Sequence, residues 1–174
     1  MSRRRVSASF YSKIGANRLV VNLSSGAAQI YCFGSGFGMA QVGSATPALC
    51  AAISSSACTW EDVTATLAVE QAAEWENGGH MAAYCCSKTL LSGYAIVAAR
   101  ENPTLTVTFI SPGFINTAMT AGFGASLSPE EGAVSARYCL FGEVTSGWFY
   151  GSDGKRSPMH KGRDPGEPEK DGVI

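Results

Sequence analysis

The sequence has almost no net charge. Its 13 Lys and Arg residues balance 14 Asp and Glu residues, which leaves a formal charge of −1 at pH 7. Such a chain lacks the positive field that draws proteins to nucleic acids and other polyanions. It also lacks an apolar run as long as a membrane-spanning helix requires. We therefore expect neither a nucleic-acid partner nor a membrane partner.

The six cysteines show no Cys-x-x-Cys spacing, so they match neither a zinc site nor a disulfide framework. We therefore expect no bound metal, and six reduced thiols in a reducing compartment, the cytoplasm. Residues 1–18 carry several arginines and serines but no acidic residue. This composition also fits an organelle transit peptide, so import into an organelle stays open. The plainer interpretation is the end of a helix that leads into the first strand.

Tyr84 and Lys88 are four residues apart, so in a helix their side chains lie on one face. An ammonium group beside a phenol favours the phenolate, and such a pair is suited to general acid–base catalysis. A serine hydroxyl from another segment would hold a carbonyl oxygen against the phenol. A Tyr-x-x-x-Lys pair is common on exposed helices, however, and carries weight only with its neighbours.

Two strand-like segments flank this pair. Residues 18–23 are short, apolar and β-branched, and they lead into Ser24-Ser25-Gly26. Residues 105–110 are similar and lead into Ser111-Pro112-Gly113, with Thr117 shortly after. The order N-x-S-S, Y-x-x-x-K and P-G-x-x-x-T resembles the C-terminal half of the short-chain dehydrogenase/reductase family. The resemblance covers about residues 17–150.

The resemblance implies an α/β fold, the C-terminal part of a Rossmann-type doubly wound parallel sheet without its N-terminal half. We expect about three strands in the order 18–24, 105–110 and 146–150. Helices are predicted over residues 47–57, from Trp60 to about Glu76, and over residues 81–101 and 128–141. The capping pattern Ser128-Pro129-Glu130-Glu131 marks the start of the last of these.

One truncated domain is expected over residues 1–150. A helical insertion at about residues 40–80 resembles the carbonyl-reductase branch of the family. From Gly151 onward the composition shifts to glycine, proline and charge, so residues 151–174 are expected to form a poorly ordered tail. The first stretch of this tail, through Pro158, is nevertheless compatible with packing onto the sheet.

The resemblance also implies roles for individual residues. Tyr84 would donate or accept the proton, Lys88 would bind the nicotinamide ribose, and Ser25 would orient the substrate oxygen. The substrate would be a small carbonyl compound or alcohol, and the cofactor NADP or NAD, with the branch favouring NADP. A monomer is favoured, because the insertion would cover the helix that most of the family uses as a subunit interface. The implied cofactor-binding residues are Tyr84, Lys88, Pro112, Gly113, Ile115, Asn116 and Thr117.

The glycine-rich turn that seats the cofactor's phosphates has no counterpart in the sequence. Gly34, Gly36 and Gly38 come close, but Met39 stands where the third glycine of the fingerprint belongs. We interpret residues 34–38 as a mobile loop beside the substrate site. A second interpretation of the chain stays open, a catalytically silent fragment or a binding module. A glycine fingerprint encoded in frame immediately upstream of Met1 would favour the enzyme.

Overall fold

The computed structural model describes residues 18–33, 47–55, 57–74, 79–159 and 163–170. Within them, β1 (Arg18–Leu23), β2 (Leu105–Ile110) and β3 (Phe149–Tyr150) form a three-stranded sheet in the order β1-β2-β3. Both pairings are parallel, and β1 pairs with β2 in register from Arg18 with Leu105 to Leu23 with Ile110. The α/β class, strand order and strand direction predicted from the sequence are confirmed.

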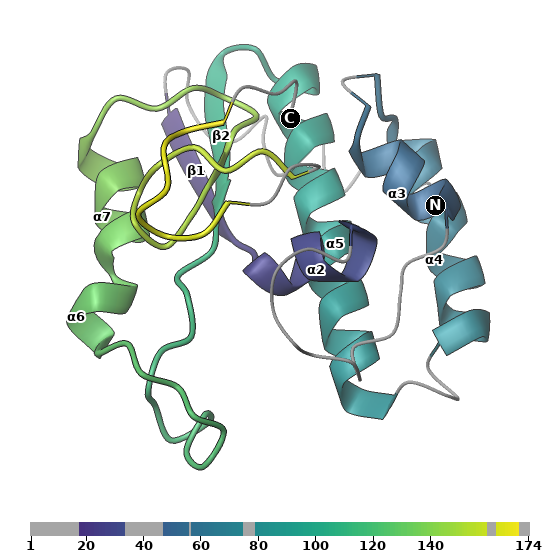
Figure 1. Ribbon diagram of the computed structural model, residues 1–174. Coiled ribbons are helices and arrows are strands. Elements are labelled where there is room, and N and C mark those ends of the chain that lie inside the picture. Colours follow the sequence, from purple (N-terminus) through teal and green to yellow (C-terminus); the bar gives the residue numbers. More distant parts are fainter. Residues whose placement is uncertain (1–17, 34–46, 56, 75–78, 160–162, 171–174) are drawn as a thin grey trace.

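Helices cover both faces of this sheet (Figure 1). The long helix α5 (Gly79–Glu101) lies on one face, where Val107 and Phe109 of β2 join a buried cluster with Ala95 and Ile96. Helix α7 (Val134–Phe141) lies on the other, where Ile110 and Cys139 share a second cluster. Side chains alternate between the faces of a strand, so β2 supplies both cores and is buried along most of its length.

Helices α3 (Pro47–Ile53) and α4 (Trp60–Glu74) pack against α5 on the side away from the sheet (Figure 1). Thr59 caps α4 reciprocally: Asp62 N–H donates to its hydroxyl, and its own N–H donates to the Asp62 carboxylate. Both helices approach α5 at Gly93, where a Cβ atom would lie 3.1 Å from Val63 and 3.2 Å from Ile53. The described part of the segment 40–80 thus covers α5.

Several elements differ from those predicted. Helix α2 (Gly26–Phe33) follows Ser25 and was not predicted from the sequence, whereas residues 34–46, with the expected loop, lie outside the described residues. The helix predicted over 47–57 ends at Ile53, and the last strand, predicted over 146–150, covers Phe149–Tyr150. The helix predicted over 128–141 is divided into α6 (Pro129–Gly132) and α7. The division falls at Ala133, whose N–H bonds to the carbonyls of both Pro129 and Glu130, which tightens the turn. The predicted capping box of Ser128 and Glu131 is present.

The described residues beyond Tyr150 lie against the rest of the fold. Ser157, Pro158 and Met159 are buried, and Gln29 of α2 donates to the backbone carbonyls of Ser157 (3.3 Å) and Pro158 (3.0 Å). Among the described residues of this segment, Asp153 pairs with Arg163 and Glu167 with Lys170. The poorly ordered tail over residues 151–174 stays a prediction. The domain boundary at residue 150 stays a prediction. None of the helices in the described ranges is long and apolar enough to cross a membrane.

Candidate active site

The turns that follow β1 and β2 meet at the carboxyl edge of the sheet. Leu23 and Ile110, the last residues of the two strands, are register partners. The Ser111 hydroxyl accepts hydrogen bonds from the N–H of Gly26 at 3.0 Å and from the N–H of Gly113 at 3.3 Å. One side chain therefore ties together the Ser-Ser-Gly and Ser-Pro-Gly turns singled out in the sequence.

Lys88 brings the third pattern to the same edge. Its Nζ donates to the carbonyl of Leu23 at 2.9 Å and lies 5.8 Å from the centre of the Tyr84 ring. The ammonium group therefore lies between the end of β1 and the tyrosine, as the helical spacing of four residues predicts. The Tyr84 side chain is 45% exposed, whereas its neighbours Cys85 and Cys86 are buried. The phenol is thus open to a ligand.

A buried pair of serine hydroxyls holds the Lys88 backbone close to the end of β1. Ser24 Oγ lies 2.7 Å from Ser92 Oγ, and these two hydroxyls lie 3.0 and 2.9 Å from the carbonyl oxygen of Lys88. Residue 88 is therefore held to β1 twice, through its ammonium by Leu23 and through its carbonyl by Ser24. Ser92 was not among the residues predicted from the sequence, although its position four residues after Lys88 places it on the same helix face.

We expect Ser92→Ala to lower the free energy of unfolding by about 1–2 kcal/mol, because a buried hydrogen bond is lost while Ser24 keeps the Lys88 carbonyl as a partner. Urea denaturation of the variant and the wild type measures this difference. Ser87→Ala is the matched control, because Ser87 is exposed and its hydroxyl donates within its own helix, to the Tyr84 carbonyl at 2.7 Å. Equal losses for both variants would contradict a special role for the buried pair.

Ser25 lies at the start of α2, half-buried, and its hydroxyl accepts a hydrogen bond from the N–H of Ala27 at 3.1 Å. It therefore acts as a helix cap, a role that leaves its own proton available for a further bond. Helix α2 was not predicted from the sequence, although a serine at an N-cap position is a known helix-start signal. The convergence of the Ser25 and Tyr84 hydroxyls stays a prediction.

The remaining predicted residues lie in the loop from β2 to α6. Asn116 N–H donates to the Leu127 carbonyl at 2.8 Å, and an isolated β-bridge joins Ile115 to Leu127. The beginning and the end of the loop therefore lie side by side. The Thr120 hydroxyl bonds to the Ile115 carbonyl, accepts from Thr117 N–H at 2.9 Å and lies 3.2 Å from the Thr117 hydroxyl. Thr120 thus shapes the turn that presents Ile115, Asn116 and Thr117.

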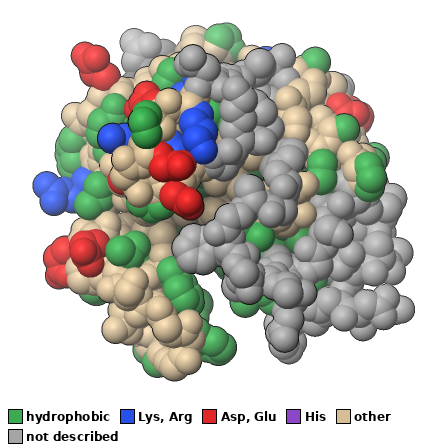
Figure 2. All heavy atoms as spheres, viewed as in Figure 1, with side chains coloured by type: hydrophobic (Ala, Val, Ile, Leu, Met, Phe, Trp, Pro, Cys, Tyr) green, Lys and Arg blue, Asp and Glu red, His purple; other side chains and the backbone are tan. Residues whose placement is uncertain are grey.

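This loop carries exposed apolar side chains, Phe114, Met119 and Phe123, which are 50%, 86% and 73% exposed. It projects from the body of the molecule below α6 (Figure 1), and hydrophobic side chains lie on the corresponding lower part of the surface (Figure 2). The loop after β2 thus exposes three large apolar side chains.

Pro112 and Gly113 form the turn at the start of this loop. Gly113 has a φ of +83°, and a Cβ atom there would lie 2.5 Å from Leu127 and 3.0 Å from Ser152.

We expect Gly113→Ala to cost about 2–4 kcal/mol in unfolding free energy, because the alanine must adopt a left-handed conformation and its Cβ atom overpacks the turn. Thermal denaturation checks this. Gly122→Ala is the control, since it has a φ of +82° but no atom within 4 Å of the added carbon. If Gly113→Ala cost no more unfolding free energy than Gly122→Ala, the expected steric clash of the added Cβ atom with Leu127 and Ser152 would be contradicted.

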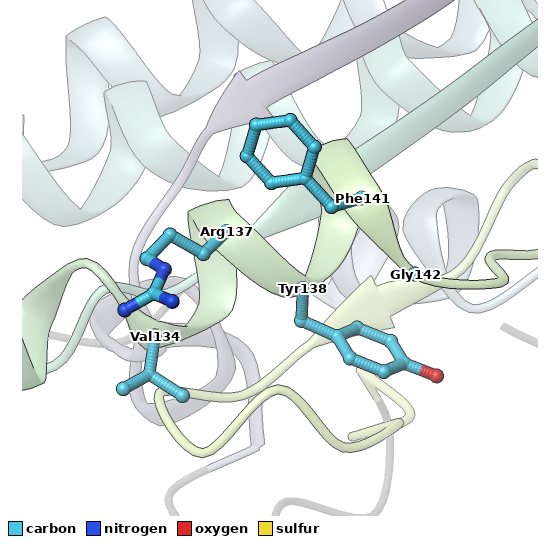
Figure 3. Close-up of a pocket in the computed structure, with 5 residues that line it drawn as sticks. All are labelled: Val134, Arg137, Tyr138, Phe141 and Gly142. Atoms are coloured by element: carbon cyan, nitrogen blue, oxygen red, sulfur yellow. The ribbon is translucent and has the colours of Figure 1, made fainter.

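A separate depression lies on α7, on the face of the sheet opposite α5. It is lined by Val134, Arg137, Tyr138, Phe141 and Gly142, and Figure 3 shows the side chains of Tyr138 and Phe141 pointing to different sides of the helix. It is distinct from the Tyr84 site. No group of three or more potential metal-ligating side chains occurs among the residues that the structure describes.

A three-stranded parallel sheet of this order with helices on both faces is a Rossmann-like α/β arrangement, and a Tyr-x-x-x-Lys helix lies at its carboxyl edge. No family model matches the chain. Over 73 residues it is 42% identical to (+)-neomenthol dehydrogenase from Arabidopsis thaliana, covering 40% of this chain and 24% of that protein. Both this relative and the solved structure described next are enzymes of the short-chain dehydrogenase/reductase family.

The structure of salutaridine reductase from Papaver somniferum is similar to this chain with a TM-score of 0.63 and 23% sequence identity. The match covers 84% of this chain and 50% of that one. The chain thus spans about a quarter of the length of the curated relative and half of the solved structure. The resemblance to the family is confirmed over this part of its length.

Proposed function

We propose that this chain carries the catalytic part of an NAD(P)-dependent oxidoreductase that transfers hydride between a nicotinamide cofactor and a carbonyl or alcohol group. The observation that carries the proposal is the position of Lys88, whose ammonium lies between the Leu23 carbonyl and the Tyr84 ring. Further support comes from the relatives, since both are oxidoreductases of this family.

The residues at the carboxyl edge fit the nicotinamide end of such a cofactor. Lys88 has three N–H donors, of which one is used by Leu23, so donors remain for ribose hydroxyls. Tyr84, Asn116 and Thr117 belong to the family's sequence motifs, and all three are exposed and carry polar groups that can bind a ligand. When bound, the cofactor supplies or accepts the hydride. Pro112, Gly113 and Ile115 would contact it through the turn they form.

In the direction of reduction, Tyr84 gives its phenolic proton to the substrate oxygen, on which negative charge develops. Lys88 stabilises the phenolate that is left, because a positive charge beside the ring favours the ionised form. Ser25 donates a hydrogen bond from its hydroxyl to the same oxygen, keeps its proton, and so holds the substrate carbonyl in place. In the direction of oxidation, the Tyr84 phenolate takes the proton from the alcohol.

The finer assignments extend this proposal. NADP is favoured over NAD by the resemblance to the carbonyl-reductase branch, and the substrate would be a small ketone, aldehyde or quinone, or the matching alcohol. The names of the relatives, a neomenthol dehydrogenase and a salutaridine reductase, are consistent with a carbonyl or alcohol substrate. The protein would be cytoplasmic. It would also be monomeric, because α3 and α4 cover part of α5, the helix that most of the family uses as a subunit interface.

The second candidate is a catalytically silent fragment or a binding module. It is favoured by the absence from the sequence of a glycine fingerprint for the phosphates. Phosphate contacts supply several hydrogen bonds to charged groups at about 1.5–3 kcal/mol each, so the 174-residue chain alone should bind the cofactor weakly.

The experiment that separates the two candidates uses the 174-residue chain and, beside it, the same chain joined to any in-frame sequence encoded upstream. NADPH and NADH are titrated by fluorescence, and their oxidation is followed with a panel of ketones, aldehydes and quinones. We expect turnover in the longer protein, with a preference for NADPH. Absence of turnover with either protein and every substrate would support the silent fragment.

A further inference from the structure

Two of the six cysteines differ from the others in their surroundings. Cys32 lies in the last turn of α2 and Cys50 in α3, and both are half-buried. The other four, Cys58, Cys85, Cys86 and Cys139, are buried. Burial raises the pKa of Cys58 and Cys85 to about 11 and also raises that of Cys139. These three are therefore poorly suited to thiol–disulfide exchange, which requires a thiolate.

The Cys50 side chain lies directly against residue 32. Its thiol donates to the carbonyl oxygen of Cys32 at 3.1 Å, and α2 and α3 pack together there. From ordinary bond lengths, Cys50 Sγ lies within about 5.5 Å of the Cys32 Cα. The Cys32 thiol points toward α5, with its sulfur 4.0 Å from the Thr89 hydroxyl. A disulfide between them requires rotation of the Cys32 side chain about χ1, away from Thr89, and a small approach of the two helices.

We propose that Cys32 and Cys50 form an oxidative modification site, an intramolecular disulfide made by exchange with a small-molecule disulfide such as oxidised glutathione. The thiolate of one cysteine attacks the oxidant, releases one glutathione thiol and forms a mixed disulfide. The second cysteine's thiolate then attacks the protein sulfur and displaces the second glutathione thiol. Two protein thiols are oxidised and one disulfide of the oxidant is reduced to two thiols, which take up the two protons that the protein thiols lose.

The cross-link would join α2 to α3 across the 17 residues between the two cysteines. Since α2 begins directly after Ser25, the bond would anchor the helix that holds the proposed substrate-orienting serine. In the reducing cytoplasm the two thiols stay reduced, and the bond forms when the glutathione pool is oxidised.

The test is oxidation of the 174-residue chain with oxidised glutathione, followed by thiol counting and peptide mapping. Trypsin leaves both cysteines in one peptide, because no Lys or Arg occurs between Arg18 and Lys88. Chymotrypsin separates them, because Phe33 and Phe37 lie between them. We expect six reactive thiols in the denatured protein to fall to four, and a cross-linked peptide pair that contains Cys32 and Cys50.

Cys50→Ser should abolish the cross-link and keep its five thiols, whereas the matched control Cys58→Ser should still form it. The oxidised wild type should melt roughly 5–10 °C above the reduced protein, and a reductant should reverse the shift. Six thiols that persist in the oxidised wild type would overturn the proposal, as would a peptide map that joins other cysteines. The peptide map of the wild type decides the matter even if a variant fails to fold.

Discussion

Replacing Tyr84 by phenylalanine is expected to lower kcat of the active protein by roughly 10²–10⁴-fold, because the substrate oxygen loses its proton donor. The fold should be unchanged, since the residue is 45% exposed and the substitution removes only the hydroxyl. KM should change little if the phenol acts mainly in the transition state. Steady-state kinetics with NADPH and a responsive ketone measure both constants.

Tyr94→Phe is the matched control for this variant. Tyr94 lies on the same helix, ten residues after Tyr84 in the sequence. Its ring makes an edge contact with the Trp60 ring, with 5.4 Å between the two ring centroids. It should retain turnover within a few-fold of the wild type. A Tyr84→Phe protein with wild-type turnover would exclude the tyrosine as the proton donor, whatever the reaction.

Removing the Asp153 carboxylate is expected to cost about 3–5 kcal/mol of unfolding free energy, because it leaves a buried positive charge without its counter-ion. The side chain of Arg163 is fully buried and forms a two-pronged ion pair with Asp153. The same guanidinium donates to the carbonyls of Arg156 at 3.0 Å and Glu167 at 2.7 Å, so one side chain organises the segment beyond β3.

Urea denaturation of Asp153→Ala measures this cost, and Glu167→Gln is the control. Glu167 pairs with Lys170 at 3.0 Å, but both side chains are well exposed, so that loss should be below about 1 kcal/mol. Equal effects of the two variants would contradict the organising role of the buried pair. We expect Gln29, which contacts residues 157 and 158, to transmit the loss to α2.

The same ion pair predicts a dependence of stability on pH. Burial acts to raise the pKa of Asp153, but hydrogen bonds from Arg163, Gly166 and Lys155 and the guanidinium charge lower it to about 2. The folded-state pKa is below the ordinary value of 3.8, so the ionised carboxylate stabilises the fold above about pH 4. This contribution is lost as the pH falls from about 4 to about 2. The stability difference between wild type and Asp153→Asn should shrink across that range.

The sequence predicted the parts of the fold that depend on local pattern. Apolar β-branched runs predicted β1 and β2, and a capping pattern predicted the start of α6. The order and direction of the strands came from the family resemblance and are confirmed. The Tyr-x-x-x-Lys spacing predicted that Lys88 and Tyr84 share a helix face, and in the structure the Lys88 ammonium lies 5.8 Å from the centre of the Tyr84 ring. Each of these local patterns depends on residues close together in the chain.

The parts that sequence reasoning missed depend on contacts between distant residues. Ser92 acquires its role only when β1 brings Ser24 within 2.7 Å of it, 68 positions away in the chain. From the sequence alone Arg163 is a solvated charge, but in the structure Asp153 and four backbone carbonyls surround it. The break at Ala133 has a tertiary setting too, because the buried Gly132 beside it lies so near Ile115 that a Cβ atom would be 2.1 Å from that side chain.

The distance between Ser25 Oγ and Tyr84 Oη tests the proposed site most directly, and a crystal structure of the chain would measure it. Both hydroxyls must reach one substrate oxygen, so we predict a separation of roughly 3–5 Å, allowing for the looser geometry of a ligand-free site. The measurement needs neither cofactor nor turnover, and so it tests the catalytic arrangement separately from activity. A separation above ~10 Å would contradict the assignment of these two residues to one catalytic centre.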